Sequence, residues 1–147
     1  MSNLVYKANG INKKRLRVVI ATIPSDSHTW NLVFLELLFK NHDCDTLNLG
    51  CCTPYSEIQK NSKNIDLVVI STVNGHGYSE GLELIQFLKN TMKNTIPPII
   101  IGGKLGVKGS ENKQYYSTLL NSGYSAVFDD SVPIEDFEKY IECRKNL

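Results

Sequence analysis

The sequence lacks the features that mark several large classes of protein. It has no apolar run near the roughly 18 residues that a membrane-spanning helix needs, and its start, MSNLVYKANGIN, has no hydrophobic signal-peptide region. Its 16 Lys and Arg residues nearly balance its 15 Asp and Glu residues, which argues against nucleic-acid binding driven by overall charge. We therefore expect no membrane partner, no nucleic-acid partner and a cytoplasmic location.

The cysteines do not form a recognisable metal motif. The four cysteines (Cys44, Cys51, Cys52 and Cys143) match no zinc signature in their spacing. The adjacent Cys51 and Cys52 cannot easily close a disulfide together, because that bond requires a specific geometry. Free thiols in a reducing cytosol are the expected state.

Phosphate-binding motifs are missing too. The chain has no GxxxxGK[ST], and no GxGxxG follows its first predicted strand. A response-regulator receiver domain would need acidic residues after the first strand and an aspartate at the end of the third. Pro24 and Ser71 stand at those places, which argues against a receiver.

Positive charge gathers at the N-terminus. Residues 1–17 carry five basic residues and no acid, whereas the remainder has a net charge of −4. With 147 residues in all, we expect a flexible basic tail over 1–13 and one domain over 14–147. An arm that docks on an acidic partner and a targeting signal remain alternatives for the tail.

Five apolar segments alternate with five amphipathic ones. The predicted strands are 16–23, 44–49, 67–71, 99–101 and 126–128, and the predicted helices are 30–40, 54–61, 79–94, 112–122 and 133–145. This order predicts an α/β fold with a doubly wound, flavodoxin-like (Rossmann-like) five-stranded parallel sheet of strand order 2-1-3-4-5. Thr53 is expected to cap the second helix. The first helix is expected to bury Val33, Phe34, Leu37 and Leu38.

The residues that do not look like core follow strands 1, 3 and 4. They form the segments 24–31, 71–77 and 102–109, at the edge where open α/β sheets bind ligands. Their glycines Gly75, Gly77, Gly102 and Gly103 would let a backbone approach a bulky ligand closely.

Asp26 and His28 form an Asp-x-His pair after strand 1. A metal-ligating imidazole usually donates its other N–H to a carboxylate, so this loop could supply both the ligand and the group that orients it. A loop histidine hydrogen-bonded to a neighbour is the alternative. A zinc site shared by His28 and His76 has no evident third ligand.

These motifs together resemble a known family. Asp26-Ser27-His28, Ser71-Thr72-Val73 and Gly102-Gly103, each after its own strand, resemble the DxHxxG…SxL…GG pattern of cobalamin (B12)-binding domains. The small subunit of glutamate mutase (methylaspartate mutase) is the most similar family, and its Ser-Asp-Cys-His-Ala stretch resembles residues 25–29. The likeness covers roughly 17–141.

The resemblance implies a base-off cobalamin site with His28 as the axial cobalt ligand and Asp26 as its hydrogen-bond partner. Ser71 would bond the detached dimethylbenzimidazole base, and Thr72 and Val73 would line the pocket of the nucleotide tail. The implied cofactor-binding residues are Ser25, Asp26, Ser27, His28, Thr29, Ser71, Thr72, Val73, Gly75, Gly102, Gly103, Lys104, Leu105, Gly106, Val107 and Lys108.

The chain departs from the family pattern at several positions, of which 30, 31 and 104 bear most on cofactor binding. Asn31 replaces the glycine of DxHxxG, and asparagine tolerates left-handed backbone geometry better than most residues. Trp30 precedes it and could stack on the cofactor, pack as a core residue or crowd the pocket. Lys104 replaces the asparagine usual after the double glycine.

The resemblance also implies a function. The chain would be the cobalamin-carrying, non-autonomous subunit of an adenosylcobalamin-dependent carbon-skeleton mutase, an isomerase that interconverts glutamate and 3-methylaspartate in the family. The catalytic site would lie on a larger barrel-type subunit in a heteromer, with no catalytic residue and no turnover in this chain alone. A corrinoid carrier, a mutase-derived subunit of another pathway, and a flavodoxin-like module that has lost cobalamin are the alternatives.

Overall fold

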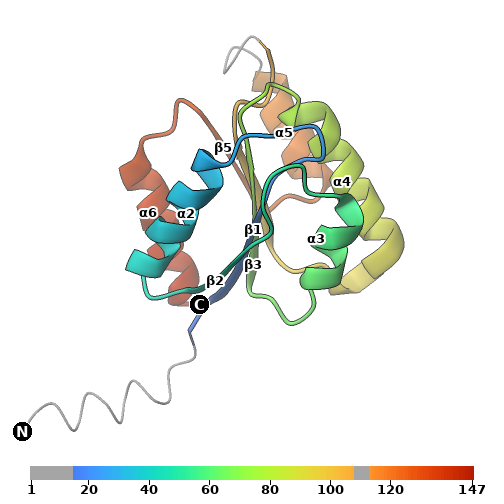
Figure 1. The fold of residues 1–147 in the computed structure, drawn as a ribbon. Coiled ribbons are helices and arrows are strands. Elements are labelled where there is room, and N and C mark those ends of the chain that lie inside the picture. Colours follow the sequence, from blue (N-terminus) through green and yellow to red (C-terminus); the bar gives the residue numbers. More distant parts are fainter. Residues whose placement is uncertain (1–14, 108–112) are drawn as a thin grey trace, which may run out of the picture.

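A parallel five-stranded sheet lies at the centre of the computed structural model, which describes residues 15–107 and 113–147 (Figure 1). The strand order is β2-β1-β3-β4-β5, so the predicted flavodoxin-like topology is confirmed. The strands are β1 (Arg17–Ala21), β2 (Asp45–Asn48), β3 (Leu67–Thr72), β4 (Ile99–Gly103) and β5 (Ala126–Asp129). The chain leaves β1 in one direction to β2 and returns on the other side of β1 to β3, which places the switch point between β1 and β3.

The helices cover both faces of this sheet. They are α2 (Trp30–Asn41), α3 (Tyr55–Asn61), α4 (Gly77–Met92), α5 (Lys113–Ser122) and α6 (Ile134–Lys145), with a short 3₁₀ turn η1 (Lys93–Thr95) after α4. Figure 1 shows α2 and α6 on one face and α3, α4 and α5 on the other. Each face therefore has its own hydrophobic core.

Alternation along the strands divides the buried side chains between the two cores. Val68 and Ile70 of β3 belong to the core under α3, α4 and α5, whereas Leu67 and Val69 belong to the core under α2 and α6. Because successive side chains of a strand point to opposite faces, neighbours such as Ser71 and Thr72 must also diverge. This alternation decides which rim residues can share a cavity.

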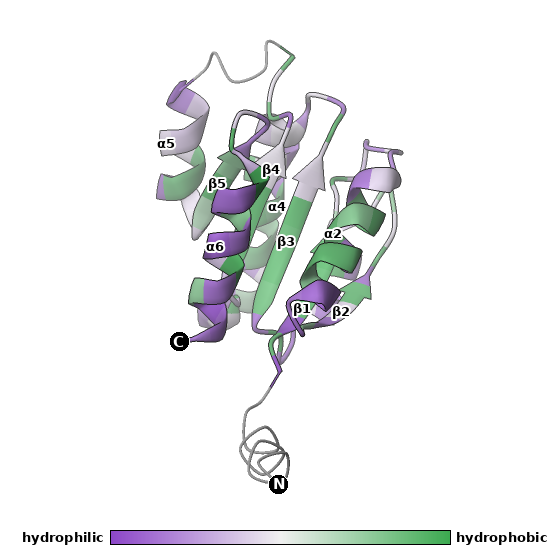
Figure 2. Cartoon of the chain, turned by 90° about the vertical axis from the view of Figure 1, so that its left-hand side faces the viewer, coloured by the Kyte–Doolittle hydropathy of each residue, from purple (hydrophilic) through white to green (hydrophobic). Residues whose placement is uncertain are grey.

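The prediction of which face of α2 is buried is wrong. The helix buries Leu32, Leu38 and Phe39 against the sheet. Phe34 is 52% exposed and Leu37 is 58% exposed, so of the four residues predicted as buried only Leu38 is buried. Eight of the twelve residues of α2 are apolar, and Figure 2 shows the resulting hydrophobic colour around much of the helix. The periodicity alone therefore did not select one face.

Two smaller expectations also change. Pro54, not Thr53, is the N-cap of α3, and it makes no side-chain capping bond. The Thr53 hydroxyl instead donates to the carbonyl of Gly50 and accepts the N–H of Thr22, 3.1 Å away. Thr53 therefore joins the loop after β2 to the end of β1.

The N-terminal basic cluster is described only in part. The expected tail over 1–13 lies outside the described residues, as does Lys108. Arg15 forms an ion pair with Asp45, and Arg17 lies 3.7 Å from Asp66. Within the described residues, no helix combines the length and the apolar character that crossing a membrane requires.

Candidate functional site

The loop after β1 passes over the carboxyl ends of the strands, beside the loop after β3. Asp26 is the only acidic residue in the segment 24–31, and it is fully buried. Its Oδ2 accepts the backbone N–H groups of Val73 at 2.6 Å and Asn74 at 3.2 Å. One carboxylate thus joins the two loops that flank the switch point.

Asp26 also holds His28. Its Oδ1 accepts the backbone N–H of His28 at 3.1 Å and lies 2.7 Å from the ring Nδ1. Burial raises the pKa of Asp26, but the hydrogen bonds from Val73, His28 and Asn74 outweigh burial and leave that pKa below its ordinary value. Asp26 is therefore an ionised carboxylate, and its Oδ1 accepts a hydrogen bond from a protonated Nδ1 of His28.

The other nitrogen of His28 is available. The side chain is 54% exposed, and within residues 15–107 and 113–147 no hydrogen bond involves Nε2. A neutral imidazole with Nδ1–H fixed by a carboxylate presents its lone pair at Nε2, which is the arrangement of an oriented metal ligand. No group of three or more potential metal-binding side chains occurs in the described part of the chain, so His28 would act as a single protein ligand.

Glu80, which the sequence did not single out, and Asn74 support this loop. Glu80 of α4 accepts the backbone N–H of Ser25 at 3.1 Å and also the Ser25 hydroxyl. The amide of Asn74 donates to the same hydroxyl at 2.9 Å. Nothing in local spacing connects Glu80 with a serine 55 positions earlier, so only the fold reveals this contact. Ser27 and Thr29 are exposed, and Thr29 begins α2 through its carbonyl.

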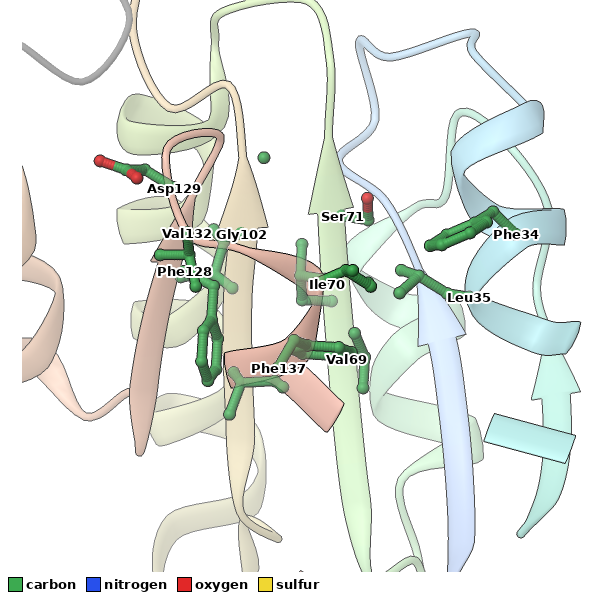
Figure 3. A pocket seen from close by; sticks show the side chains of 14 residues that line it. Phe34, Leu35, Val69, Ile70, Ser71, Gly102, Phe128, Asp129, Val132 and Phe137 are labelled. Carbon is green, nitrogen blue, oxygen red and sulfur yellow. The ribbon is translucent and has the colours of Figure 1, made fainter. Parts of the chain in front are cut away.

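A cavity of about 250 Å³ lies between the sheet and the helices α2 and α6 (Figure 3). Apolar side chains dominate its lining, and Ser71 and Asp129 are the only lining residues with polar side chains. The Asp129 carboxylate accepts the N–H of Ser131 at 2.9 Å and points away from the cavity in Figure 3. The lining residues are Phe34, Leu35, Val69, Ile70, Ser71, Ile100, Ile101, Gly102, Gly103, Phe128, Asp129, Val132, Ile134 and Phe137.

Ser71 is a predicted site residue that lines this cavity with a polar side chain. Its hydroxyl oxygen accepts the side-chain amide of Asn31 at 2.9 Å. Thr72 points to the opposite face, where it is buried and its hydroxyl donates to the carbonyls of Gly102 and Lys104. Val73 is partly exposed beyond the strand and contacts Asp26 through its backbone. The structure thus brings Ser71, but neither Thr72 nor Val73, to the cavity.

The two glycines of β4 line the cavity, yet the chain itself requires them. A Cβ on Gly102 would lie 2.4 Å from the carbonyl oxygen of Phe128, and one on Gly103 would lie 2.0 Å from that of Thr72. Gly103 also has a φ of +96°. Close packing of neighbouring strands is therefore sufficient to explain both glycines, whether or not a ligand approaches them.

The loop after β4 lies mainly on the other side of the sheet. Leu105 is buried in the core with α4 and α5, and a Cβ on Gly106 would lie 2.7 Å from the ring of Tyr115. Lys104 and Val107 are exposed at the rim, and Gly75 packs against Val107. Among the described residues of this loop, Lys104 and Val107 are therefore the ones that are free to contact a ligand above the rim.

Trp30 neither packs in the core nor fills the cavity. It is 82% exposed at the start of α2, two residues after His28. Asn31 lies within the helix and has no positive φ, so the expected left-handed turn is absent. The glycine position of the family pattern is occupied here by a helical residue whose side chain hydrogen-bonds to Ser71.

Comparison with solved structures identifies the fold class of the chain. The chain is similar to a receiver domain of a Francisella response regulator, with a TM-score of 0.65 and 19% identity, covering 90% of this chain and 98% of that one. It is also similar to a cobalamin-binding protein from Desulfitobacterium hafniense DCB-2, with a TM-score of 0.64 and 23% identity, covering 89% of this chain and 60% of that one. At these identities the likeness establishes the flavodoxin-like fold.

Sequence comparison is more specific. No protein-family profile matches the chain. The chain is 25% identical over 127 residues to the glutamate mutase sigma subunit of Escherichia coli O157:H7, which covers 84% of this chain and 83% of that protein. It is 26% identical over 121 residues to glutamate mutase sigma subunit 1 of Haloarcula marismortui. The resemblance to glutamate mutase small subunits that the motifs predicted is therefore confirmed.

Proposed function

We propose that this chain is the cobalamin-binding small subunit of an adenosylcobalamin-dependent carbon-skeleton mutase. The observation that carries the proposal is the His28–Asp26 pair, in which Nδ1 is held at 2.7 Å while Nε2 makes no hydrogen bond within the described residues of the chain. The sequence similarity to glutamate mutase sigma subunits supports it. The cofactor would supply the radical chemistry.

The donor chemistry of the loop fits an axial cobalt ligand. Asp26 would fix the tautomer and the ring orientation of His28, so that Nε2 could ligate the metal. Because Asp26 also joins the loops after β1 and β3, contacts from both loops hold the proposed ligand in place. His28 is the proposed cobalt ligand, and Asp26 is the proposed positioning residue.

The cavity fits one part of a large ligand. Its volume of about 250 Å³ is below the common range for whole-ligand pockets, which is roughly 300–1,000 Å³. A flat aromatic base would contact the rings of Phe34, Phe128 and Phe137, while the Ser71 hydroxyl offers a polar contact near the rim. We assign this cavity to the nucleotide tail of the cofactor.

The exposed rim points to a partner. His28 and Trp30 are both open to solvent, and a corrin bound to His28 would keep its far side uncovered. Radical chemistry requires exclusion of water and of side reactions, which another surface would have to provide. We propose a larger barrel-type subunit as that partner, and expect no turnover by this chain alone.

One alternative loses its support. A module that has lost cobalamin would be favoured by a Trp30 that fills the pocket, but Trp30 is exposed and the cavity is present. A corrinoid carrier or a mutase-derived subunit of another pathway would use the same site. The reaction observed when the chain is combined with the large subunit of a glutamate mutase distinguishes these alternatives.

Cobalamin titration tests the proposal. We expect the absorption spectrum of added aquocobalamin to change to that of a base-off, histidine-ligated form with the wild type and with His76→Ala, an exposed histidine on the neighbouring loop. We expect no such change with His28→Ala. Reduction to cob(II)alamin and EPR spectroscopy, with ¹⁵N-labelled histidine, would identify the nitrogen ligand directly. Identical spectra for wild type and His28→Ala would overturn the proposal.

A further inference from the structure

Asn31, in the first turn of α2, binds a residue that lines the cavity. Its side-chain amide donates to the Ser71 hydroxyl at 2.9 Å and to the Ser71 carbonyl at 3.3 Å. The two residues belong to α2 and β3, so the contact spans the space between helix and sheet. In the family pattern a glycine without a side chain stands at this position.

The place of Asn31 on α2 puts it between the axial ligand and the cavity. Phe34 and Leu35, which line the cavity, follow Asn31 by three and four positions and therefore share its helical face. His28 precedes Asn31 by three positions, on the rim. A ligand with its metal at His28 and an arm inside the cavity would therefore run beside the contact between Asn31 and Ser71.

This contact is incompletely satisfied. The side-chain Oδ1 of Asn31 is buried without a hydrogen-bond partner within the described residues. An unpaired buried acceptor costs free energy, so the closed arrangement is less stable than its two amide hydrogen bonds suggest. The backbone gives no reason for asparagine here, because Asn31 is helical and has no positive φ. The side chain of Asn31 can therefore both block a ligand and move aside when its contact with Ser71 breaks.

We propose that Asn31 is a gate residue, which closes the entrance to the tail cavity by binding Ser71 and thereby controls the loading of tailed corrinoids. The inference rests on the proposed cobalamin-binding function. In this closed state the Ser71 hydroxyl already accepts the amide of Asn31. A nucleotide tail enters only after the amide of Asn31 has left Ser71.

The test compares two corrinoids with two variants. Aquocobalamin carries the nucleotide tail, and aquocobinamide lacks it. Asn31→Ala removes the amide and favours the helix, while Asn41→Ala, an exposed residue at the far end of α2, is the matched control. If the closed state is favoured by one net hydrogen bond, Asn31→Ala should raise the apparent affinity and the association rate for aquocobalamin about fivefold.

The rates follow from stopped-flow absorption and the affinities from spectral titration, neither of which needs mutase activity. Aquocobinamide should bind the wild type and Asn31→Ala with equal affinity and rate, and Asn41→Ala should behave as the wild type with both ligands. Equal or weaker aquocobalamin binding by Asn31→Ala would overturn the gate, as would an equal gain with aquocobinamide. Failure of the wild type to bind either corrinoid would instead contradict the proposed function itself.

Discussion

At the scale of single residues, Gly103 shows how a motif position can have a purely structural cause. Its φ of +96° is costly for any residue with a side chain, and a Cβ would overlap the carbonyl oxygen of Thr72. The double glycine of the resemblance therefore carries less information about a ligand than the Asp26–His28 pair, whose geometry has no comparable packing explanation.

Substitution at two glycines separates backbone strain from steric overlap. Gly50 has a φ of +84° and no atom within 4 Å of a Cβ, so Gly50→Ala should cost about 1 kcal/mol of unfolding free energy from strain alone. Gly103→Ala should cost roughly 3 kcal/mol more, because overlap with β3 adds to the strain. Urea denaturation measures both values, and equal losses would contradict this interpretation.

The residues of the site differed in how far the sequence could predict them. Asp26 and His28 are close in the chain, so their contact could be predicted from the local pattern. Glu80 and Asn31 act on partners 55 and 40 positions away, and no local signal indicates those contacts. Thr72 could have been separated from Ser71 in advance, since adjacent strand residues point to opposite faces.

At the scale of elements, α2 is the helix whose buried face the sequence left undetermined. Apolar residues occur on most of its surface, so two stripes compete for burial. The sheet selects Leu32, Leu38 and Phe39. The strands were predicted to within a few residues, four of them from short apolar runs bounded by turn residues and β2 from the alternation of polar and apolar residues. The orientation of a helix that is apolar on most sides depends instead on what packs against it.

Two leucine variants test which face of α2 is buried. Leu32 is 1% exposed, so Leu32→Ala should lower the free energy of unfolding by about 2–5 kcal/mol through lost burial and a new cavity. Leu37 is 58% exposed, and Leu37→Ala should change that free energy by no more than about 0.5 kcal/mol. Comparable losses from the two variants in thermal or urea denaturation, or a larger loss for Leu37→Ala, would contradict this assignment of the buried face.

At the scale of the whole molecule, α2 and α6 form one layer that bounds the cavity. Both helices contribute lining residues, among them Phe34 of α2 and Phe137 of α6. At the C-terminal end of α2, His42 lies between two glutamates of α6: Nε2 is 3.0 Å from Glu138, and Nδ1 contacts Glu142. An ionisable contact therefore joins α2 and α6 at the C-terminal end of α2.

This contact should make stability depend on pH. The carboxylates of Glu138 and Glu142 outweigh burial and raise the pKa of His42 above its ordinary value of 6.5, while Lys145 lies 3.7 Å from Glu142 and weakens its effect. Because the folded-state pKa is raised, the stabilisation is fully present below pH 6.5 and is lost as pH rises through the folded-state pKa. Ion pairs of this exposure contribute up to about 1 kcal/mol, or roughly 3 °C in Tm.

The prediction is tested by Tm profiles between about pH 6 and pH 9. The wild type should lose a few degrees across this range in excess of His42→Gln, in which the ring and its titration are absent. His76→Gln, which removes an exposed histidine outside the α2–α6 layer, should keep the wild-type profile. If His42→Gln and wild type show parallel profiles, the contact with α6 does not stabilise the fold.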